Sequence, residues 1–555
     1  MTSTVVAAQT ERAPTPVSVA SHVSESRPNI LIIIADDMGY SDLGSFGGEI
    51  ETPNLDRLAM AGVRFSNFIV NPACSPTRAT LYTGVDPHLA GVGNMYEELS
   101  PNQKGQPGYE GHLNDSVVSV ATLLRDSGYS TYLSGKWHLS NAPGQGPGSQ
   151  GFERSFALNS GGASHFADML PAYHPDPNAK ASYTEDDRPL AKLPEAFEYS
   201  SQYYVDRLLD YLNEHSKDQP FFAVLAYTAP HWPLQAPDAA IAKYQGRYDE
   251  GYDALYQQRR ERVARLGLIP AAKEPPRPPR ARPWAELSAQ QRRIEARTME
   301  VYAAMIDEMD AHTGRLIDHL RDSGQLDNTL VLFMSDNGPE GHDLDETWSA
   351  ELFPAIRRVI DERYDFSFDN IGRPNSYAFY GAGWAAAGSA GLRMYKAFPS
   401  EGGTRVTAFM HYPGRVTAGS IHHAPVPVRD IVPTLLEVAG VEHPDERYAG
   451  RPIHPLQGQS LVSRLTNSAD AAESSPALGI ELFGKYALRK GDWKLLVMPP
   501  PYASGKAELY NIARDPGEAQ NLAGQEPERL AAMLALWEEY VAANGVILPD
   551  WVSGY

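Results

Sequence analysis

One cysteine has both the residue type and the sequence position of a reactive side chain. Cys74 is the only cysteine in 555 residues, and Pro76 and Arg78 follow it. Pro76 suits the first turn of a helix, because its missing N–H would have no partner there. A cysteine at a helix N-terminus, with an arginine one turn on, lies in a positive field that favours a thiolate or a bound anion. The plainer alternative is a buried structural thiol.

Oxygen donors directly follow two strongly apolar segments of the chain. These donors are Asp36, Asp37, Asp336 and Asn337. Three carboxylates and an amide suit Ca²⁺ or Mg²⁺ far better than Zn²⁺, which prefers cysteine and histidine. One aspartate in such a place would be read as a helix cap, but two such pairs favour a shared metal ion.

Cationic and imidazole side chains complete the pattern. Lys136 and His138 follow one apolar segment, His231 follows another, and Lys396 lies further along. A lone histidine is more often a packing or surface residue, but the position after a buried strand favours a chemical role. A metal ion and several cations around a nucleophile are what hydrolysis of a tetrahedral oxyanion ester requires. A histidine can then protonate the departing alkoxide or phenoxide.

The segments that carry these side chains predict an α/β fold. Four apolar segments are typical of buried strands: 29–35, 129–134, 221–227 and 329–334. Ligands bind at the carboxyl edge of such sheets. Helical periodicity falls between them, at 54–61, at 116–126 (capped by Asn114 or Asp115), at 203–214 and along 299–320. We therefore predict a large, mostly parallel sheet with helices on both faces.

The two ends of the chain differ from its centre. Residues 1–27 lack the basic and apolar segments of a secretory signal, which predicts a disordered tail. Beyond about Pro455, a hairpin turn at Lys490 and Gly491 and a helical pattern at 527–544 predict a small antiparallel sheet with a helix. We expect a tail at 1–27, a catalytic α/β domain at 28–455 and a small α+β domain at 456–555.

Charge and composition exclude several partners. The 48 basic and 69 acidic residues give a net charge of −21, which argues against nucleic acid and anionic membranes. The apolar run 30–35 is far too short to span a bilayer. The missing signal predicts a cytoplasmic protein, or a periplasmic one if the true start of translation differs.

Several blocks of the chain resemble the type I sulfatases. The pentapeptide CSPTR at 74–78 is similar to the family signature, in which the cysteine is oxidised to formylglycine (3-oxoalanine). The other similar blocks follow in the family's order: 28–37, 135–138, 229–233, 335–338, 395–405 and 508–523. The resemblance covers 28–555 and is strongest to the bacterial calcium-dependent arylsulfatases. It implies that the large sheet is of the alkaline-phosphatase-like type. Thr407 departs from it, since the family more often has proline there.

The resemblance implies hydrolysis of sulfate monoesters, most of all aryl sulfates. It implies these catalytic residues: Cys74, Arg78, Lys136, His138, His231 and Lys396. It implies these ligands of Ca²⁺, with Mg²⁺ as the alternative: Asp36, Asp37, Cys74, Asp336 and Asn337. The hydrate at position 74 would attack sulfur, with His231 near the leaving oxygen and His138 taking a proton from the second hydroxyl. The implied partners are a small sulfate ester and a formylglycine-generating maturation enzyme.

Two rival functions stay open on the sequence. A phosphonate or phosphate ester hydrolase could use the same scaffold, because the three non-bridging oxygens are common to all these substrates. A non-catalytic anion- or metal-binding relative would need a lost catalytic group, and each expected one is present. Five aromatic residues are candidates for the pocket mouth, although each is also a candidate for packing: Trp137, Trp232, Tyr377, Tyr380 and Trp384.

Overall fold

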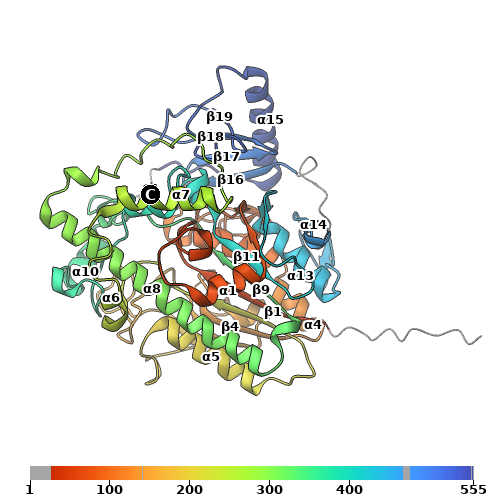
Figure 1. Ribbon diagram of the computed structural model, residues 1–555. Coiled ribbons are helices and arrows are strands. Elements are labelled where there is room, and N and C mark those ends of the chain that lie inside the picture. Colours follow the sequence, from red (N-terminus) through yellow and green to blue (C-terminus); the bar gives the residue numbers. More distant parts are fainter. Residues whose placement is uncertain (1–26, 141, 467–475, 552, 554–555) are drawn as a thin grey trace, which may run out of the picture.

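A ten-stranded sheet forms the centre of the part of the chain described by the computed structural model, residues 27–140, 142–466, 476–551 and 553 (Figure 1). Its middle strands are parallel: β9 (Thr329–Ser335), β1 (Asn29–Ala35), β8 (Phe221–Ala226), β4 (Ser130–Lys136) and β5 (Arg154–Leu158). The outer strands are β11 (Ala408–His411), β2 (Val63–Phe65) and β12 (Ser420–His422) beyond β9, and β6 (Tyr183–Glu185) and β7 (Arg188–Pro189) beyond β5.

Helices cover both faces of this sheet. Alternate residues of β1 enter two different hydrophobic cores, since successive side chains of a strand point to opposite faces. One core contains side chains of α1 (Pro53–Ala61), α5 (Ser200–Glu214) and α8 (Ala289–Asp322). The other contains side chains of α2 (Cys74–Thr83), α4 (Val120–Asp126) and α13 (Ile431–Ala439). The predicted mostly parallel sheet, covered on both faces, is confirmed.

The remaining elements are short or lie at the periphery. The helices are α3 (Pro87–Ala90), α6 (Asp238–Lys243), α7 (Gly251–Arg265), α9 (Leu344–Thr347), α10 (Pro354–Arg363), α11 (Ala382–Gly388), α12 (Glu401–Thr404) and α14 (Val462–Thr466). The strands are β3 (Phe68–Ile69), β10 (Arg405–Val406) and β13 (Val426–Pro427) in one small sheet, and β14 (Arg447–Tyr448) and β15 (Arg451–Pro452) as a pair. Over the described residues, none of the helices is both long and apolar enough to cross a bilayer.

One predicted helix begins later than its sequence pattern indicated. Helix α4 starts at Val120 and is capped by Ser119, whose hydroxyl accepts the Thr122 N–H at 3.0 Å. The expected cap, Asn114, instead accepts the N–H of Ser116 at 3.0 Å, which is the hydrogen bond of a local turn. The prediction of a helix from residue 116 was wrong, because an Asx turn competes with helix initiation.

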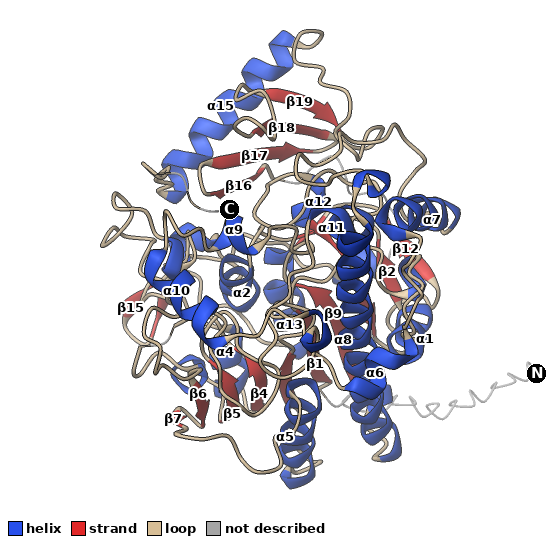
Figure 2. Ribbon diagram, turned by 90° about the vertical axis from the view of Figure 1, so that its left-hand side faces the viewer, coloured by secondary structure: helices blue, strands red, loops and turns tan. Residues whose placement is uncertain are grey.

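A small antiparallel sheet lies beside the large one, with a single helix packed on it (Figure 2). Its strands are β16 (Leu478–Leu482), β17 (Lys485–Lys490), β18 (Trp493–Val497) and β19 (Glu508–Asn511), and the helix is α15 (Pro527–Asn544). Trp537 of α15 stacks on Tyr486 with ring centroids 4.2 Å apart. The predicted small sheet with a helix is confirmed, whereas the predicted tail lies outside the described residues except for Arg27.

Candidate active site

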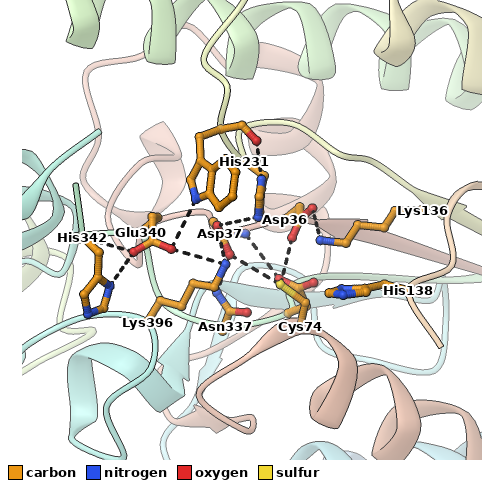
Figure 3. Close-up of polar contacts among 12 residues, drawn as sticks. Asp36, Asp37, Cys74, Lys136, His138, His231, Asn337, Glu340, His342 and Lys396 are labelled. Atoms are coloured by element: carbon orange, nitrogen blue, oxygen red, sulfur yellow. Dashed lines mark hydrogen bonds and ion pairs between the residues drawn. The ribbon is translucent and has the colours of Figure 1, made fainter. Parts of the chain in front are cut away.

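The structure brings the residues singled out in the sequence to the carboxyl edge of the large sheet. The loops after β1, β9, β4 and β8 carry most of them, and α2 points its N-terminus at the same place (Figure 3). The residues that meet there are Asp36, Asp37, Cys74, Arg78, Lys136, His138, His231, Asp336, Asn337 and Lys396.

Cys74 is the first residue of α2 and is completely buried. Its Sγ lies 3.4 Å from Asp36 Oδ1 and 3.8 Å from Asp37 Oδ1. Burial, and then the nearby Asp336 carboxylate, raise the pKa of the thiol well above its ordinary value. Desolvation and neighbouring carboxylates therefore oppose the positive field that the helix N-terminus offers to a thiolate.

Each of the three carboxylates has its own cation. Lys136 Nζ lies 2.6 Å from Asp36, and Lys396 Nζ lies 2.9 Å from Asp37. Arg78 donates from Nε and Nη2 to Asp336 Oδ2, at 3.0 and 2.7 Å. Burial raises the pKa of Asp36 to about 7 and also raises the pKa of Asp37, although the lysines oppose it. Burial acts on Asp336 as well, but Arg78, Lys136 and Lys396 together outweigh it and hold that pKa below its usual range.

The side-chain oxygens of the three aspartates and of Asn337 fit a hard divalent cation. Asn337 donates from Nδ2 to Asp37 Oδ1 at 2.7 Å and to the Gly338 carbonyl at 2.8 Å. Its Oδ1 is buried and has no hydrogen-bond partner among the described residues. An unsatisfied amide oxygen beside crowded carboxylates of raised pKa suits Ca²⁺ or Mg²⁺, because such an ion would satisfy the oxygen and neutralise the charge. Ligand atoms of Asp36, Asp37, Cys74 and His231 also lie within 4.8 Å of one another.

Both histidines of the site are buried and have a lowered pKa. His231 Nδ1 lies 2.5 Å from the Trp232 carbonyl and donates to it, so the lone pair of the neutral ring is on Nε2, 3.6 Å from Asp37 Oδ2. Burial, and then Lys396 and Lys136, lower the pKa of His231 well below its ordinary value. Burial also lowers the pKa of His138, although Glu97 opposes it.

Four further residues, which were not identified from the sequence, complete the site: Glu97, Tyr173, Glu340 and His342. Glu340 accepts from His342 Nδ1 at 2.7 Å and lies 3.4 Å from Lys396 Nζ, so it shares that lysine with Asp37. Burial raises the pKa of Glu340, but Lys396 and His342 outweigh it and bring it to about 2. Glu97 contacts both His138 and Tyr173. The one available hint was the acid–histidine spacing of Glu340 and His342, directly after the 335–338 block.

The pocket beside Cys74 has an aromatic wall. Tyr173 stacks on Trp348 with centroids 4.8 Å apart and lies 6.0 Å from the Trp232 ring. Of the five aromatic candidates from the sequence, Trp232 lines this pocket. The other four pack elsewhere: Trp137 on Tyr82, Trp384 on Tyr252, Tyr380 on Tyr302, and Tyr377 behind Trp232.

Comparisons with known proteins agree with this geometry. The sulfatase family model matches residues 28–441. An uncharacterised sulfatase of Schizosaccharomyces pombe is 42% identical over 534 residues, covering 94% of this chain and 95% of the relative. An arylsulfatase of Klebsiella aerogenes is 38% identical over 448 residues, covering 80% of this chain and 93% of the relative. The crystal structure of Ps i-CgsB with k-i-k-neocarrahexaose superposes with a TM-score of 0.65 at 24% identity over 95% of both chains. The chain therefore belongs to the sulfatase family, whose chemistry is the hydrolysis of sulfate esters.

Proposed function

We propose that the protein hydrolyses aryl sulfates by means of a formylglycine made from Cys74. The observation that carries this proposal is the position of Cys74, which lies at a helix N-terminus among three carboxylates, three cations and two histidines. A thiol with a raised pKa is a poor nucleophile, so an unmodified cysteine would serve this site badly. The hydrate of an aldehyde would place two hydroxyl groups where Sγ now stands.

The first step would transfer the sulfuryl group. One hydroxyl of the hydrate gives its proton to Asp36, whose Oδ1 lies 3.4 Å from the Sγ that stands in for this hydroxyl oxygen. The same oxygen bonds to sulfur while the bond from sulfur to the alcohol oxygen breaks, and His231 gives the alcohol oxygen a proton. Lys136 and Lys396 hold the non-bridging oxygens, and Arg78 orients the hydrate. Burial, and then Lys396 and Lys136, lower the pKa of His231. The negative charge of the bound sulfate offsets the part of this lowering that the two lysines cause.

The second step would release inorganic sulfate. His138 takes the proton of the remaining hydroxyl, the carbon–oxygen bond to the sulfate breaks, and the aldehyde returns for rehydration by water. Asp36, Asp37, Asp336, Asn337 and residue 74 would hold Ca²⁺, with Mg²⁺ as the alternative. When bound, that ion supplies positive charge beside the hydrate and the sulfate. A thiol-linked sulfate would instead need water to attack a crowded anion.

The aromatic wall supports an aryl leaving group. Tyr173, Trp232 and Trp348 offer flat faces next to Cys74, and aromatic rings stack well on such faces. The relative from Klebsiella aerogenes is named an arylsulfatase. We further propose that a formylglycine-generating enzyme acts on the chain before it folds, because Cys74 is completely buried in the folded protein.

The test combines mass spectrometry with a comparison of substrates. We expect the peptide that contains residue 74 to carry the aldehyde, and the protein to turn over an aryl sulfate much faster than the matching aryl phosphate or phosphonate. Cys74→Ala should abolish turnover without changing the fold. Active protein with an entirely unmodified thiol would overturn the mechanism. Faster turnover of the phosphonate would overturn the substrate class.

A further inference from the structure

Three side chains link the aromatic wall of the pocket to residue 74. Tyr173 donates its hydroxyl hydrogen to Glu97 Oε1 at 2.6 Å. The same oxygen lies 3.0 Å from Nε2 of His138. The ring of His138 lies beside Cys74 in Figure 3, and both line one pocket.

The hydrogen bond to Glu97 determines which nitrogen of His138 carries the proton. Burial raises the pKa of Glu97, but His138 and then Tyr173 outweigh it and lower the pKa to about 2. An ionised carboxylate only accepts, so Nε2 must donate to it. In the neutral ring the lone pair is therefore on Nδ1, which is buried and without a hydrogen-bond partner among the described residues.

The backbone at His138 adopts an uncommon conformation, and the surroundings of its ring are closely packed. His138 has a φ of +54°, in the left-handed region that few residues other than glycine adopt. Its side chain is 9% exposed, against 22% for Glu97, so Glu97 is the more exposed member of the pair. A Cβ at Gly161 would come within 2.1 Å of the Tyr173 hydroxyl and 2.7 Å of His138 Nε2, so Gly161 makes room for the contact.

We propose that Glu97 is a positioning residue for His138, and that Tyr173 in turn positions Glu97. Glu97 keeps the proton on Nε2 and presents the Nδ1 lone pair to the second hydroxyl of residue 74. That hydroxyl gives its proton to Nδ1 as the carbon–oxygen bond to the sulfate breaks. This inference rests on the proposed function, because it assigns Glu97 to the second of the two proposed steps.

The two-step scheme gives Glu97 a distinctive kinetic signature. The value of kcat/KM reports only on steps up to the first irreversible one, which is cleavage of the sulfur–oxygen bond, and His138 takes no part in that step. Slower release of sulfate lowers kcat and KM together. A residue that only supported the fold of the pocket would change kcat/KM as well.

The experiment uses Glu97→Gln in the aldehyde-bearing enzyme with a chromogenic aryl sulfate. A glutamine amide can donate as well as accept, so it no longer enforces one tautomer. We expect kcat to fall about 10²-fold with kcat/KM nearly unchanged, the scale of general-base catalysis. We also expect a burst of about one equivalent of phenol, and a sulfated peptide at residue 74 by mass spectrometry.

Three further variants serve as controls. Tyr173→Phe keeps the ring but removes the hydroxyl, and should give a smaller fall in kcat of the same kind. Glu97→Asp keeps the charge and should recover part of the activity, even if Glu97→Gln folds poorly. His138→Ala should accumulate the sulfated enzyme, and adding Glu97→Gln to it should cost little more, since both changes act through one group.

Failure of this inference can be distinguished from failure of the proposed function. If the wild-type protein carries the aldehyde and hydrolyses the ester, the proposed function stands. In that case, an equal fall in kcat and kcat/KM for Glu97→Gln, or an unchanged kcat, would overturn the positioning role. A wild-type protein that carries the aldehyde but hydrolyses no sulfate ester would overturn both.

Discussion

At the scale of single residues, Asp36 and Asp37 have matching surroundings. Each places one oxygen near a lysine, Lys136 at 2.6 Å or Lys396 at 2.9 Å, and the other oxygen near Cys74. The two lysines only partly offset the cost of burying the carboxylates, because the pKa of both aspartates is still raised. A divalent cation would offset the remaining cost of burying these carboxylates. The stabilisation of the fold by metal should therefore depend on pH.

The first prediction concerns stability in the absence of metal. Asp36 has an ordinary pKa of 3.8 and a folded pKa of about 7, so between these values the folded state binds a proton that the unfolded state has released. Stability from this group is therefore lost as pH rises from about 4 to 7. We expect added Ca²⁺ to raise Tm more at pH 7 than at pH 5, measured by thermal unfolding against EDTA-treated protein. Asn337→Ala should weaken this Ca²⁺ effect, and an equal rise in Tm at both pH values would contradict the prediction.

The sequence predicted much of this site because its residues stand at the ends of strongly apolar strands. Residue type and position indicated a hard metal ion and an oxyanion ester, and the resemblance to the sulfatases then assigned the individual roles. Glu97 and Tyr173 could not be found in this way. Glu97 lies in a three-residue 3₁₀ helix and Tyr173 in a loop, and neither is long enough to show a periodicity. Their contacts with each other and with His138 join segments that are far apart in the chain.

At the scale of elements, the middle of the sheet was predictable and its edges were not. Strand β1 is buried along its whole length and reads as a continuous apolar run. Strands β6 and β7 are two or three residues long and partly exposed, which leaves no pattern to detect. The positions of Lys136 and Asp36 depend on the predictable part, because β4 and β1 both pair with β8.

A glycine in β4 determines how closely that strand approaches β8. Gly135 has a φ of +121°, and a Cβ there would lie 1.8 Å from the Ala226 carbonyl oxygen. We expect Gly135→Ala to cost about 3 kcal/mol or more, since backbone must move, and to displace Lys136. The matched control is Gly440→Ala, at φ +66° with nothing within 4 Å, which should cost only about 1–2 kcal/mol. Urea unfolding of both variants measures the difference, and equal losses would rule out the close approach as the cause.

At the scale of the whole molecule, the small sheet packs directly on the active site. Leu482 of β16 lies in one hydrophobic cluster with Ala73, Met95 and Ala397. Ala73 directly precedes Cys74 in the chain, and Ala397 directly follows Lys396. We therefore propose that the parts 28–455 and 456–555 are two structural units that unfold together, and that the second supports the position of the nucleophile and of a sulfate-binding lysine.

A buried ion cluster across this boundary allows the last prediction. Lys494 of β18 lies 2.9 Å from Glu401 and 2.8 Å from Glu518. Burial raises the pKa of Glu401, but Lys494 and Arg489 outweigh it and lower the pKa to about 2. That carboxylate therefore contributes stability above its ordinary pKa of 4.5, and this stability is lost as pH falls toward 2.

Replacing Lys494 by methionine should leave two buried carboxylates without their shared cation. We expect Lys494→Met to lose about 3–5 kcal/mol at pH 7. The deficit should shrink toward pH 4, because protonation of the carboxylates relieves the buried charge. The exposed Lys506→Met is the control and should change stability by less than about 0.5 kcal/mol.

Urea unfolding of the wild-type protein, followed by fluorescence and by residual activity, tests whether the two structural units unfold together and should give one coincident transition. Loss of activity well before loss of fluorescence would show instead that the small sheet detaches first.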